Sequence, residues 1–324
     1  MKLNFMHTKF VIIKGSGSIA NKHIQILSEF NIKIFVLIKK NIEKKRFEKK
    51  NLKYIKFIKS LQNIDEKKVL FCLIASSTNN HLKDINFFIE KRLNIFCEKP
   101  ISNKIDNLYL IKKKILKEKI FFYVNYQLKK HFFIKKINKI VKNEKIYHIE
   151  LRVGNNLKTW RKNKIRNNSY YISNQKGGGV IFELIHEINL INLLFGEIKR
   201  IKTLKKKINI KKAEDIAISV FETNKKILGT LIQDMVAKKS ERYIKISTSE
   251  NIYKFNFINN TLDFYKKNKD KVYTLKYKKL SQMELIKKNI IDYIKWVKSN
   301  KFHTIYFDDA KKDLQICLKM HEKF

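Results

Sequence analysis

Proline and glycine are scarce in this chain of 324 residues, which contains one proline and eight glycines. This composition excludes collagen-like repeats and linkers rich in proline or glycine. Glycine tolerates positive φ angles and close backbone contacts, and proline fixes φ, so we expect the few present to stand where the fold requires them. Five of the eight glycines fall in two clusters, at residues 15–17 and 177–179, and the single proline is Pro100. We look for chemistry at these three places.

Cysteine is also scarce, with three residues at positions 72, 97 and 317. Their odd number and wide separation exclude a disulfide framework and a zinc-binding spacing, so we expect reduced thiols, no metal and a cytoplasmic protein. No apolar run reaches the roughly 18–20 residues that a membrane-spanning helix needs. The apolar stretch within residues 1–20 contains Lys9 and Lys14 and leads into a glycine turn, which favours a buried strand over a signal peptide.

Acidic residues are few, with 29 against 72 basic ones and a formal net charge of +43. Such an excess can attract nucleic acid or anionic lipid. The lysines, however, are spread over the whole chain, and arginine, which proteins prefer for phosphate and base recognition, is not enriched. The joint abundance of lysine, asparagine, isoleucine and phenylalanine indicates drift in nucleotide composition. We therefore expect solvated lysines and no specific nucleic-acid or membrane partner, with nucleic-acid binding as the alternative.

Short apolar runs alternate with amphipathic segments of helical length over the first 125 residues. Strands are predicted at 10–13, 33–38, 69–74, 94–97 and 121–124, and helices at 18–29, 78–92 and 102–118. This alternation predicts an α/β fold with a doubly wound parallel sheet.

The second half of the chain has a different pattern. After a strand at 146–153, strand-like segments follow one another without intervening helices, at 216–221, 227–236, 243–247 and 252–257. Helices are predicted at 128–143, 180–195, 281–298 and 308–322. This succession predicts an α+β domain with an antiparallel sheet.

The first glycine cluster fits the pattern G-x-G-x-x-G/A over the run Gly15-Ser16-Gly17-Ser18-Ile19-Ala20. It follows a predicted strand and opens a predicted helix. Gly15 would make the tight turn, Gly17 would let the backbone approach a pyrophosphate, and Ala20 would allow close helix–strand packing. The pyrophosphate would lie at the helix N-terminus, stabilised by free N–H groups and the helix dipole. An ordinary strand–helix turn is the alternative.

Lys39 and Lys40 follow the second strand, where a dinucleotide-binding domain usually recognises the adenosine ribose. An acidic residue there would accept the 2′-hydroxyl of NAD, whereas basic residues suit the 2′-phosphate of NADP. The absence of a carboxylate directly after this strand favours NADP, and the abundance of lysine leaves NAD open.

The only proline follows an apolar strand that ends in Glu98 and Lys99. Ligands of parallel open sheets bind at the carboxyl ends of the strands, so Lys99 is predicted to point into a crevice beside a nicotinamide. A lysine there can exchange a proton with a substrate hydroxyl or carbonyl while hydride passes to or from the ring. The alternative, a solvated lysine at a strand end, leaves the lone proline unexplained.

Taken together, these motifs resemble the glucose-fructose oxidoreductase/inositol dehydrogenase/rhizopine-catabolism (Gfo/Idh/MocA) family. The matching features, in the family's order and spacing, are the glycine loop with His23 eight positions after Gly15, the run Ser77-Thr78-Asn79-Asn80-His81, the Glu98-Lys99-Pro100 step, Tyr126-Gln127 and the glycines at 177–179. The resemblance spans nearly the whole chain. One departure is Ser77, which stands where the family usually has proline, in the loop near the nicotinamide ribose.

This resemblance implies a dinucleotide-binding Rossmann domain over residues 1–125 and a substrate-binding domain over residues 126–324. The second domain would carry a large open antiparallel sheet through which the chain forms homo-oligomers. NAD or NADP would be the cofactor and a sugar the substrate. Beyond the glycine loop and the two lysines, the resemblance places the cofactor against Ser76, Ser77, Thr78, Asn79, His81, Glu98, Lys99, Pro100 and Gln127, and the substrate against Tyr126.

Glu183, His186 and Asn189 are spaced three residues apart, so they are predicted to share one face of the helix at 180–195. The rest of this helix is apolar and expected to be buried, where a carboxylate and an imidazole need partners or a function. In the family, residues here bind substrate hydroxyls, and the histidine acts as acid or base. Glu183 and Asn189 both stand where aspartate is common, and the spacing resembles a subgroup associated with bacterial surface-glycan and nonulosonic acid gene clusters. A satisfied core histidine is the alternative.

Trp160 and Arg161 precede the second glycine cluster, in a region that borders the sugar pocket in the family. Arg161 would bind a substrate carboxylate or phosphate through two hydrogen bonds, and Trp160 would stack on a sugar face. A plain surface loop is the alternative.

These assignments predict reversible hydride transfer between a nicotinamide and a carbinol carbon of a sugar. Lys99 would relay the proton, His186 would share it, and both groups would converge over one face of the ring. Glu183 and Asn189 would orient hydroxyls. The alternatives are NAD-dependent glycoside cleavage and a non-catalytic NAD(P)-binding or nucleic-acid-binding protein.

Overall fold

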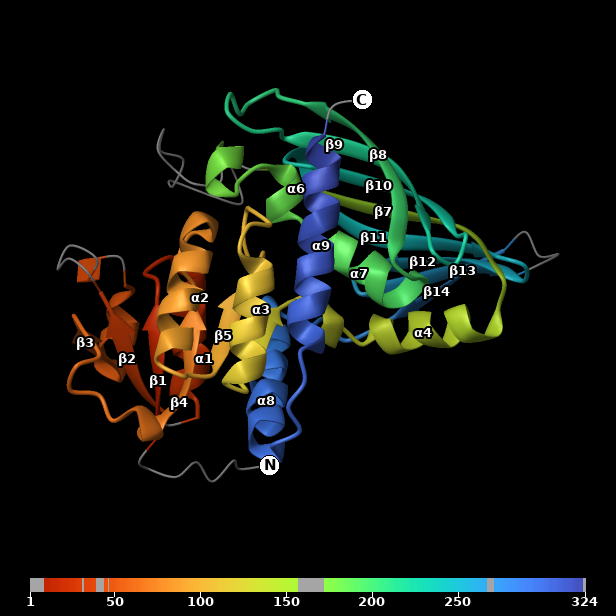
Figure 1. Cartoon of the computed structure of the whole chain (residues 1–324). Helices are drawn as coiled ribbons and strands as arrows, with labels where there is room; N and C mark the ends of the chain where they lie inside the picture. Colours follow the sequence, from red (N-terminus) through yellow and green to blue (C-terminus); the bar gives the residue numbers. More distant parts are fainter. Residues whose placement is uncertain are drawn as a thin grey trace. The chain divides into compact units, whose positions relative to one another are not determined.

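The computed structural model describes residues 9–30, 32–38, 44–45, 47–156, 172–266 and 271–322. The chain divides into two compact units (Figure 1). The first comprises Met1–Tyr126 and Gln282–Lys311, and the second comprises Gln127–Ser281 and Lys312–Phe324. The sequence pattern assigned all of residues 126–324 to one domain, whereas here a late segment of the chain returns to the first unit.

The first unit is built on a six-stranded parallel sheet in the order β3-β2-β1-β4-β5-β6. Its strands are β1 (Phe10–Lys14), β2 (Lys33–Leu37), β3 (Ile55–Ile58), β4 (Val69–Ile74), β5 (Ile95–Glu98) and β6 (Phe122–Asn125). The strand order reverses between β1 and β4, which is where ligands bind in open α/β sheets. The predicted doubly wound parallel sheet is therefore confirmed.

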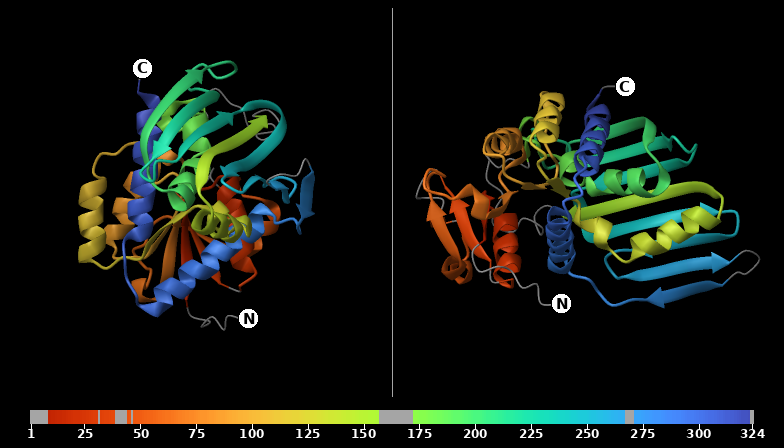
Figure 2. Two further views of the ribbon diagram at one scale, coloured as in Figure 1. Left: turned by 90° about the vertical axis from the view of Figure 1, so that its right-hand side faces the viewer. Right: turned by 60° about the horizontal axis from the view of Figure 1, so that its bottom comes forward.

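Helices cover both faces of this sheet, which explains why its central strands are continuous apolar runs (Figure 2). The helix α1 (Ser18–Ser28) packs beside α8 (Gln282–Ser299), and α2 (His81–Glu90) packs beside α3 (Leu108–Lys117). Side chains of α8, including Ile286, Ile290 and Tyr293, join the same core as β1, β4 and α1. The Tyr293 hydroxyl also donates to the Phe121 carbonyl at 2.8 Å. These contacts attach α8 to the first unit.

The second unit contains an eight-stranded sheet in the order β14-β13-β12-β11-β7-β10-β9-β8. Its strands are β7 (Ile146–Asn156), β8 (Ile198–Lys206), β9 (Ile216–Thr223), β10 (Leu228–Asp234), β11 (Val236–Thr248), β12 (Asn251–Asn256), β13 (Thr261–Lys266) and β14 (Val272–Lys276). Neighbouring strands are antiparallel except β7 and β10, which pair in parallel. The sheet is thus mixed rather than uniformly antiparallel, because the early strand β7 enters between β10 and β11.

Helices cover one face of this second sheet (Figure 2). They are α4 (Phe133–Asn143), α6 (Val180–Glu183), α7 (His186–Phe195) and the C-terminal part of α9 (Ile305–His321). Strand residues alternate accordingly: Ile149 and Leu151 are fully buried, whereas Leu204, Val220 and Leu228 are 66%, 58% and 59% exposed. The opposite face therefore carries exposed apolar side chains.

The helix predicted over residues 180–195 is broken. It consists of α6 and α7, and the segments Asn174–Glu183 and His186–Phe195 are bent by 54° at the break. Leu184 departs from helical geometry with φ −106° and ψ 34°, and its buried carbonyl accepts the Gln233 amide from β10 at 2.8 Å. Among the described residues no single helix is long and apolar enough to cross a membrane. Asn174–Glu183 and His186–Phe195 reach that length and composition only as a bent pair.

Candidate active site

The glycine loop lies between β1 and α1, at the strand-order reversal of the first sheet. Gly15 has φ +128°, and a Cβ there would lie 2.3 Å from the Ala75 carbonyl, so a side chain is excluded by backbone contact with the end of β4. Gly17 differs, because a Cβ there would meet no protein atom within 4 Å. The open space that Gly17 faces lies directly before α1.

This space suits an anionic ligand. Helix α1 begins immediately after Gly17, and the first N–H groups of a helix have no partner within it. The helix dipole adds partial positive charge at the same end. Ala20 is fully buried against the sheet, as expected for the third position of the pattern. The loop therefore fits the pyrophosphate of a dinucleotide, whose oxygens would be held by residues 15–20.

The loop after β4 is stabilised by its own side chains. The Ser76 hydroxyl donates to Asp84 at 2.6 Å, and the Asn80 amide donates to the Ser77 hydroxyl at 2.8 Å. Thr78 is buried and Asn79 is exposed. The Ser76 hydroxyl is thus tied to α2, whereas the Ser77 hydroxyl accepts one hydrogen bond and keeps its own O–H as a donor.

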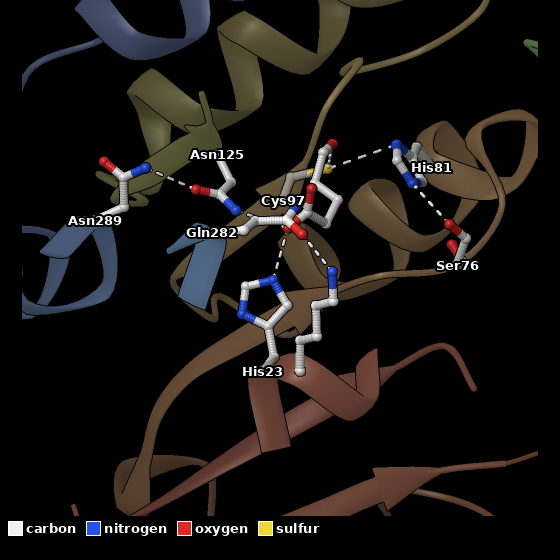
Figure 3. Close-up of polar contacts among 9 residues, drawn as sticks. His23, Ser76, His81, Cys97, Asn125, Gln282 and Asn289 are labelled. Atoms are coloured by element: carbon white, nitrogen blue, oxygen red, sulfur yellow. Dashed lines mark hydrogen bonds and ion pairs between the residues drawn. The ribbon is translucent and has the colours of Figure 1, made fainter. Parts of the chain in front are cut away.

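His81 links this loop to the loop after β5 (Figure 3). Its Nε2 lies 3.1 Å from the Ser76 carbonyl and its Nδ1 lies 2.8 Å from the Pro100 carbonyl. Burial lowers the pKa of His81, while the two carbonyls and the nearby Asp84 and Glu98 charges oppose that shift. The neutral ring can donate to one carbonyl at a time. His81 thus links the loop after β4 to the loop after β5.

Glu98 is the centre of a buried polar network, and its partners His23 and Asn125 are labelled in Figure 3. Its Oε1 lies 2.6 Å from His23 Nε2 and accepts the Asn125 amide at 2.7 Å. Burial alone would raise the pKa of Glu98, but the hydrogen bonds and charge of its partners outweigh burial, and the pKa is lowered. The carboxylate is therefore ionised at neutral pH.

The network continues from Asn125 into α8. The Asn289 amide donates to Asn125 at 2.8 Å, and Tyr123 donates to Asn289 at 2.8 Å. Side chains from α1, β5, β6 and α8 therefore hold the end of β5. Neither Asn125 nor Asn289 was predicted from the sequence, and the only available signal for Asn125 was its place at the end of a predicted strand.

Lys99 directly follows this network. It lies at the carboxyl end of β5, between buried Glu98 and buried Pro100, and its own side chain is partly exposed. Lys99 thus lies at the carboxyl end of the parallel sheet, as the sequence pattern predicted. The buried residues on either side hold its backbone in place.

The glycines at 177–179 precede α6 in the second unit. Gly179 has φ +92°, and a Cβ there would lie 2.5 Å from Glu214 Oε1. That same oxygen accepts the Ile181 N–H at 3.2 Å, so the Glu214 carboxylate caps the start of α6. The positive φ disfavours any side chain at residue 179, and the close approach of Glu214 adds to this.

Glu183, His186 and Asn189 are all buried, but they do not share one regular helical face as predicted. Glu183 ends α6 and His186 begins α7, on either side of the bend. The Asn189 amide donates to Asp313 of α9 at 2.6 Å, and among the described residues its Oδ1 has no hydrogen-bond partner. Asn189 is thus held on its amide side by α9, while its carbonyl oxygen is buried.

Several predicted residues have other placements. Lys39, Lys40, Trp160 and Arg161 lie outside the described residues. Tyr126 is buried at the end of the first unit, and Gln127, partly exposed, opens the second. Lys99 belongs to the first unit and His186 to the second.

Comparison with family models identifies both parts of the chain. Residues 8–126 match the model described as an oxidoreductase family with an NAD-binding Rossmann fold. Residues 139–306 match the model of the C-terminal α/β domain of the same oxidoreductase family. No curated protein matches the sequence significantly.

Solved structures share the fold over almost the whole chain. UDP-N-acetylglucosamine 3-dehydrogenase from Acidithiobacillus ferrooxidans is 15% identical with a TM-score of 0.78, and the match covers 98% of this chain and 97% of that one. Levoglucosan dehydrogenase, in complex with NADH and levoglucosan, is 12% identical with a TM-score of 0.81 and coverage of 96% of each chain. An oxidoreductase domain protein from Kribbella flavida is 14% identical with a TM-score of 0.80, covering 97% and 96%. At these identities the likeness establishes the fold alone.

Proposed function

This chain belongs to the Gfo/Idh/MocA family of NAD-binding oxidoreductases, and we propose that it transfers hydride between NAD(P) and a hydroxyl or carbonyl of a sugar derivative. Its membership confirms the family resemblance and makes it an NAD(P)-dependent dehydrogenase. The observation that carries the proposal is the pairing, in one unit, of the open space before α1 with Lys99 anchored at the end of β5.

The sugar substrate is supported by the fold relatives. The two named dehydrogenases among them, for UDP-N-acetylglucosamine and levoglucosan, are both named for a sugar derivative. The spacing of Glu183 and His186 further supports a role in surface-glycan or nonulosonic acid biosynthesis, which we propose as the pathway class.

The proposed roles of the residues follow from their chemistry. When bound, the cofactor supplies the hydride acceptor or donor. Lys99 accepts or returns the proton of the substrate oxygen, next to the ionised Glu98. His186 shares that proton. Glu183 and Asn189 Oδ1 accept hydrogen bonds from substrate hydroxyls and orient the ring.

A second copy of the chain is the proposed partner of the uncovered face of the eight-stranded sheet. Exposed apolar side chains on this face include Leu204, Val220 and Leu228. Exposed apolar side chains on an uncovered sheet face favour an interface. Sedimentation of wild type and of a Val220→Lys variant would test this, because the charge should shift the protein toward monomer.

Accumulation of reduced nucleotide tests the proposed reaction. Purified protein is incubated with oxidised NAD or NADP and a panel that contains UDP-N-acetylglucosamine and levoglucosan. A dehydrogenase forms reduced nicotinamide in proportion to the sugar consumed. Cleavage of a glycoside without net reduced nucleotide would contradict the proposal, because the cofactor would then act only transiently.

A further inference from the structure

A pocket of about 370 Å³ opens in the first unit beside the glycine loop. It begins at Lys14, the residue before Gly15, and runs past the ends of β2 and β3 to one side of α2. Its apolar lining includes Leu37, Leu61 and Phe87, and Phe87 is 37% exposed. Pockets of this size and character accept a small ligand, and an apolar lining suits a flat aromatic base.

Four lysines line this pocket, and within the part of the chain that the structure describes only some of them have a hydrogen-bond or ion-pair partner. The Lys91 ammonium lies 3.7 Å from Glu66, and the Lys14 ammonium donates to the Leu37 carbonyl at 3.4 Å. Lys59 and Lys83, in contrast, show no hydrogen-bond or ion-pair partner among the described residues. Two ammonium groups are therefore available to an anion from the β3 and α2 sides of the pocket.

NAD recognition usually needs a carboxylate that accepts the ribose hydroxyls, and the described lining offers little for this role. Asp84 is the acidic residue in the described lining, and its Oδ2 already accepts the Ser76 hydroxyl at 2.6 Å. The sequence after β2 reads Ile38-Lys39-Lys40, without a carboxylate to accept two ribose hydroxyls. Because lysine is abundant throughout the chain, the number of lysines in the lining is not evidence for an anion site. Their position around an apolar lining beside the glycine loop indicates a ligand with an apolar part and an anionic group.

We propose that this pocket binds the adenosine end of the cofactor with its 2′-phosphate, and that Lys59 and Lys83 make the enzyme specific for NADP over NAD. The inference rests on the proposed function, since it assigns specificity within the same cofactor site. Each lysine contributes a charge-assisted hydrogen bond to the 2′-phosphate, and such bonds change affinity by roughly 10- to 100-fold. The ribose 2′-hydroxyl of NAD would gain nothing comparable from an ammonium pair.

Calorimetric binding of two half-ligands to the full chain tests the specificity without any turnover. The probes are 2′,5′-ADP, which carries the 2′-phosphate, and 5′-AMP, which lacks it. We expect 2′,5′-ADP to bind at least about tenfold more tightly. The double variant Lys59→Ala/Lys83→Ala should lose that advantage while 5′-AMP affinity stays within about twofold. The unchanged 5′-AMP affinity also verifies that the variant is folded.

The net charge of +43 requires a matched control, since any anion is attracted to this protein. Lys113→Ala/Lys117→Ala removes the same charge from α3 and should keep the preference for 2′,5′-ADP. Equal binding of the two probes to wild type, or an equal loss in both double variants, would overturn the inference.

Binding of the whole dinucleotides separates this inference from the proposed function. If NADH and NADPH both bind but with equal affinity, the proposed oxidoreductase stands and the specificity assignment fails. If neither dinucleotide binds, both fail. Tighter binding of NADPH than of NADH, lost in the Lys59→Ala/Lys83→Ala variant, would support both.

Discussion

The two units hold their polar groups in different ways. In the first, Glu98, Lys99 and Asn125 lie at or directly after the ends of parallel strands, so sheet topology places them at its carboxyl end, and a side-chain network holds them there. In the second, Glu183 and His186 lie on either side of a bend between two helices, and the Leu184 carbonyl within the bend accepts a hydrogen bond from Gln233. A motif at the end of a parallel strand therefore predicts where its side chains lie. A helical spacing predicts this only where the helix is regular.

Gly15→Ala should have the largest effect on stability and tests the tight packing of the first unit. The new Cβ would lie 2.3 Å from Ala75 backbone at a φ of +128°. Steric overlap and an unfavourable φ together should lower the free energy of unfolding by about 2–5 kcal/mol. Urea unfolding measures the loss. Wild-type stability in this variant would show that the β1 and β4 loops are not in contact.

His23→Ala tests whether a charge network anchors the strand end. It would leave the buried Glu98 carboxylate without its 2.6 Å partner, lowering the free energy of unfolding by about 2–4 kcal/mol. His23→Gln retains a donor and should recover part of the stability and of the turnover. If alanine and glutamine behave alike, hydrogen bonding to Glu98 is not what matters.

Asn189→Leu is the corresponding change in the second unit. It removes one donor to Asp313, but the Asn192 amide still donates to that carboxylate at 2.8 Å. The free energy of unfolding should therefore fall by a smaller amount, about 1–3 kcal/mol. Differential unfolding of wild type and variant in urea measures it. A loss as large as that of His23→Ala would remove the contrast drawn between the two units.

Much of the first unit could be predicted from sequence, and for a physical reason. A parallel sheet buried on both faces produces continuous apolar runs, so β1, β2, β4, β5 and β6 were predicted to within two residues at each end. The short strand β3, Ile-Lys-Phe-Ile, was missed because its alternation is too brief to distinguish from a loop. The site motifs were located because Gly15 and Lys99 lie next to those runs.

Less of the second unit could be predicted. The strand β8 is half lysine and arginine, because one face is exposed, and the pattern did not identify it. At the bend between α6 and α7 the Leu184 carbonyl bonds to Gln233, which is about 50 residues away in sequence, and no local periodicity reports such a contact. The contacts of Asn189 with α9 and of Glu187 with β11 could not be predicted for the same reason.

Acid titration sharpens the role of the network in the first unit. The folded pKa of Glu98 lies below its ordinary value of 4.5, because its hydrogen bonds and nearby charges outweigh burial. The carboxylate therefore stabilises the fold fully above about pH 4.5, and this contribution is lost as pH falls through the folded pKa. Urea midpoints across this range should fall more steeply for wild type than for Glu98→Gln. Parallel curves would contradict the assignment.

Gly17→Ala should have the smallest effect on stability and a clear effect on binding. A Cβ there meets no protein atom within 4 Å, so the free energy of unfolding should change by less than about 0.5 kcal/mol. The methyl group would occupy the space proposed for the pyrophosphate, so NADPH affinity should fall at least about tenfold. Unchanged affinity would mean that the nucleotide does not lie against this loop.

Single-turnover hydride transfer by Lys99→Met, at saturating nucleotide and sugar, tests the central claim most directly. The account predicts a rate about 10²- to 10⁴-fold lower than wild type even when nucleotide and sugar are saturating, since proton transfer at the substrate oxygen is lost. Lys113→Met, an exposed change on α3, should keep the wild-type rate. Full turnover by Lys99→Met would contradict the account.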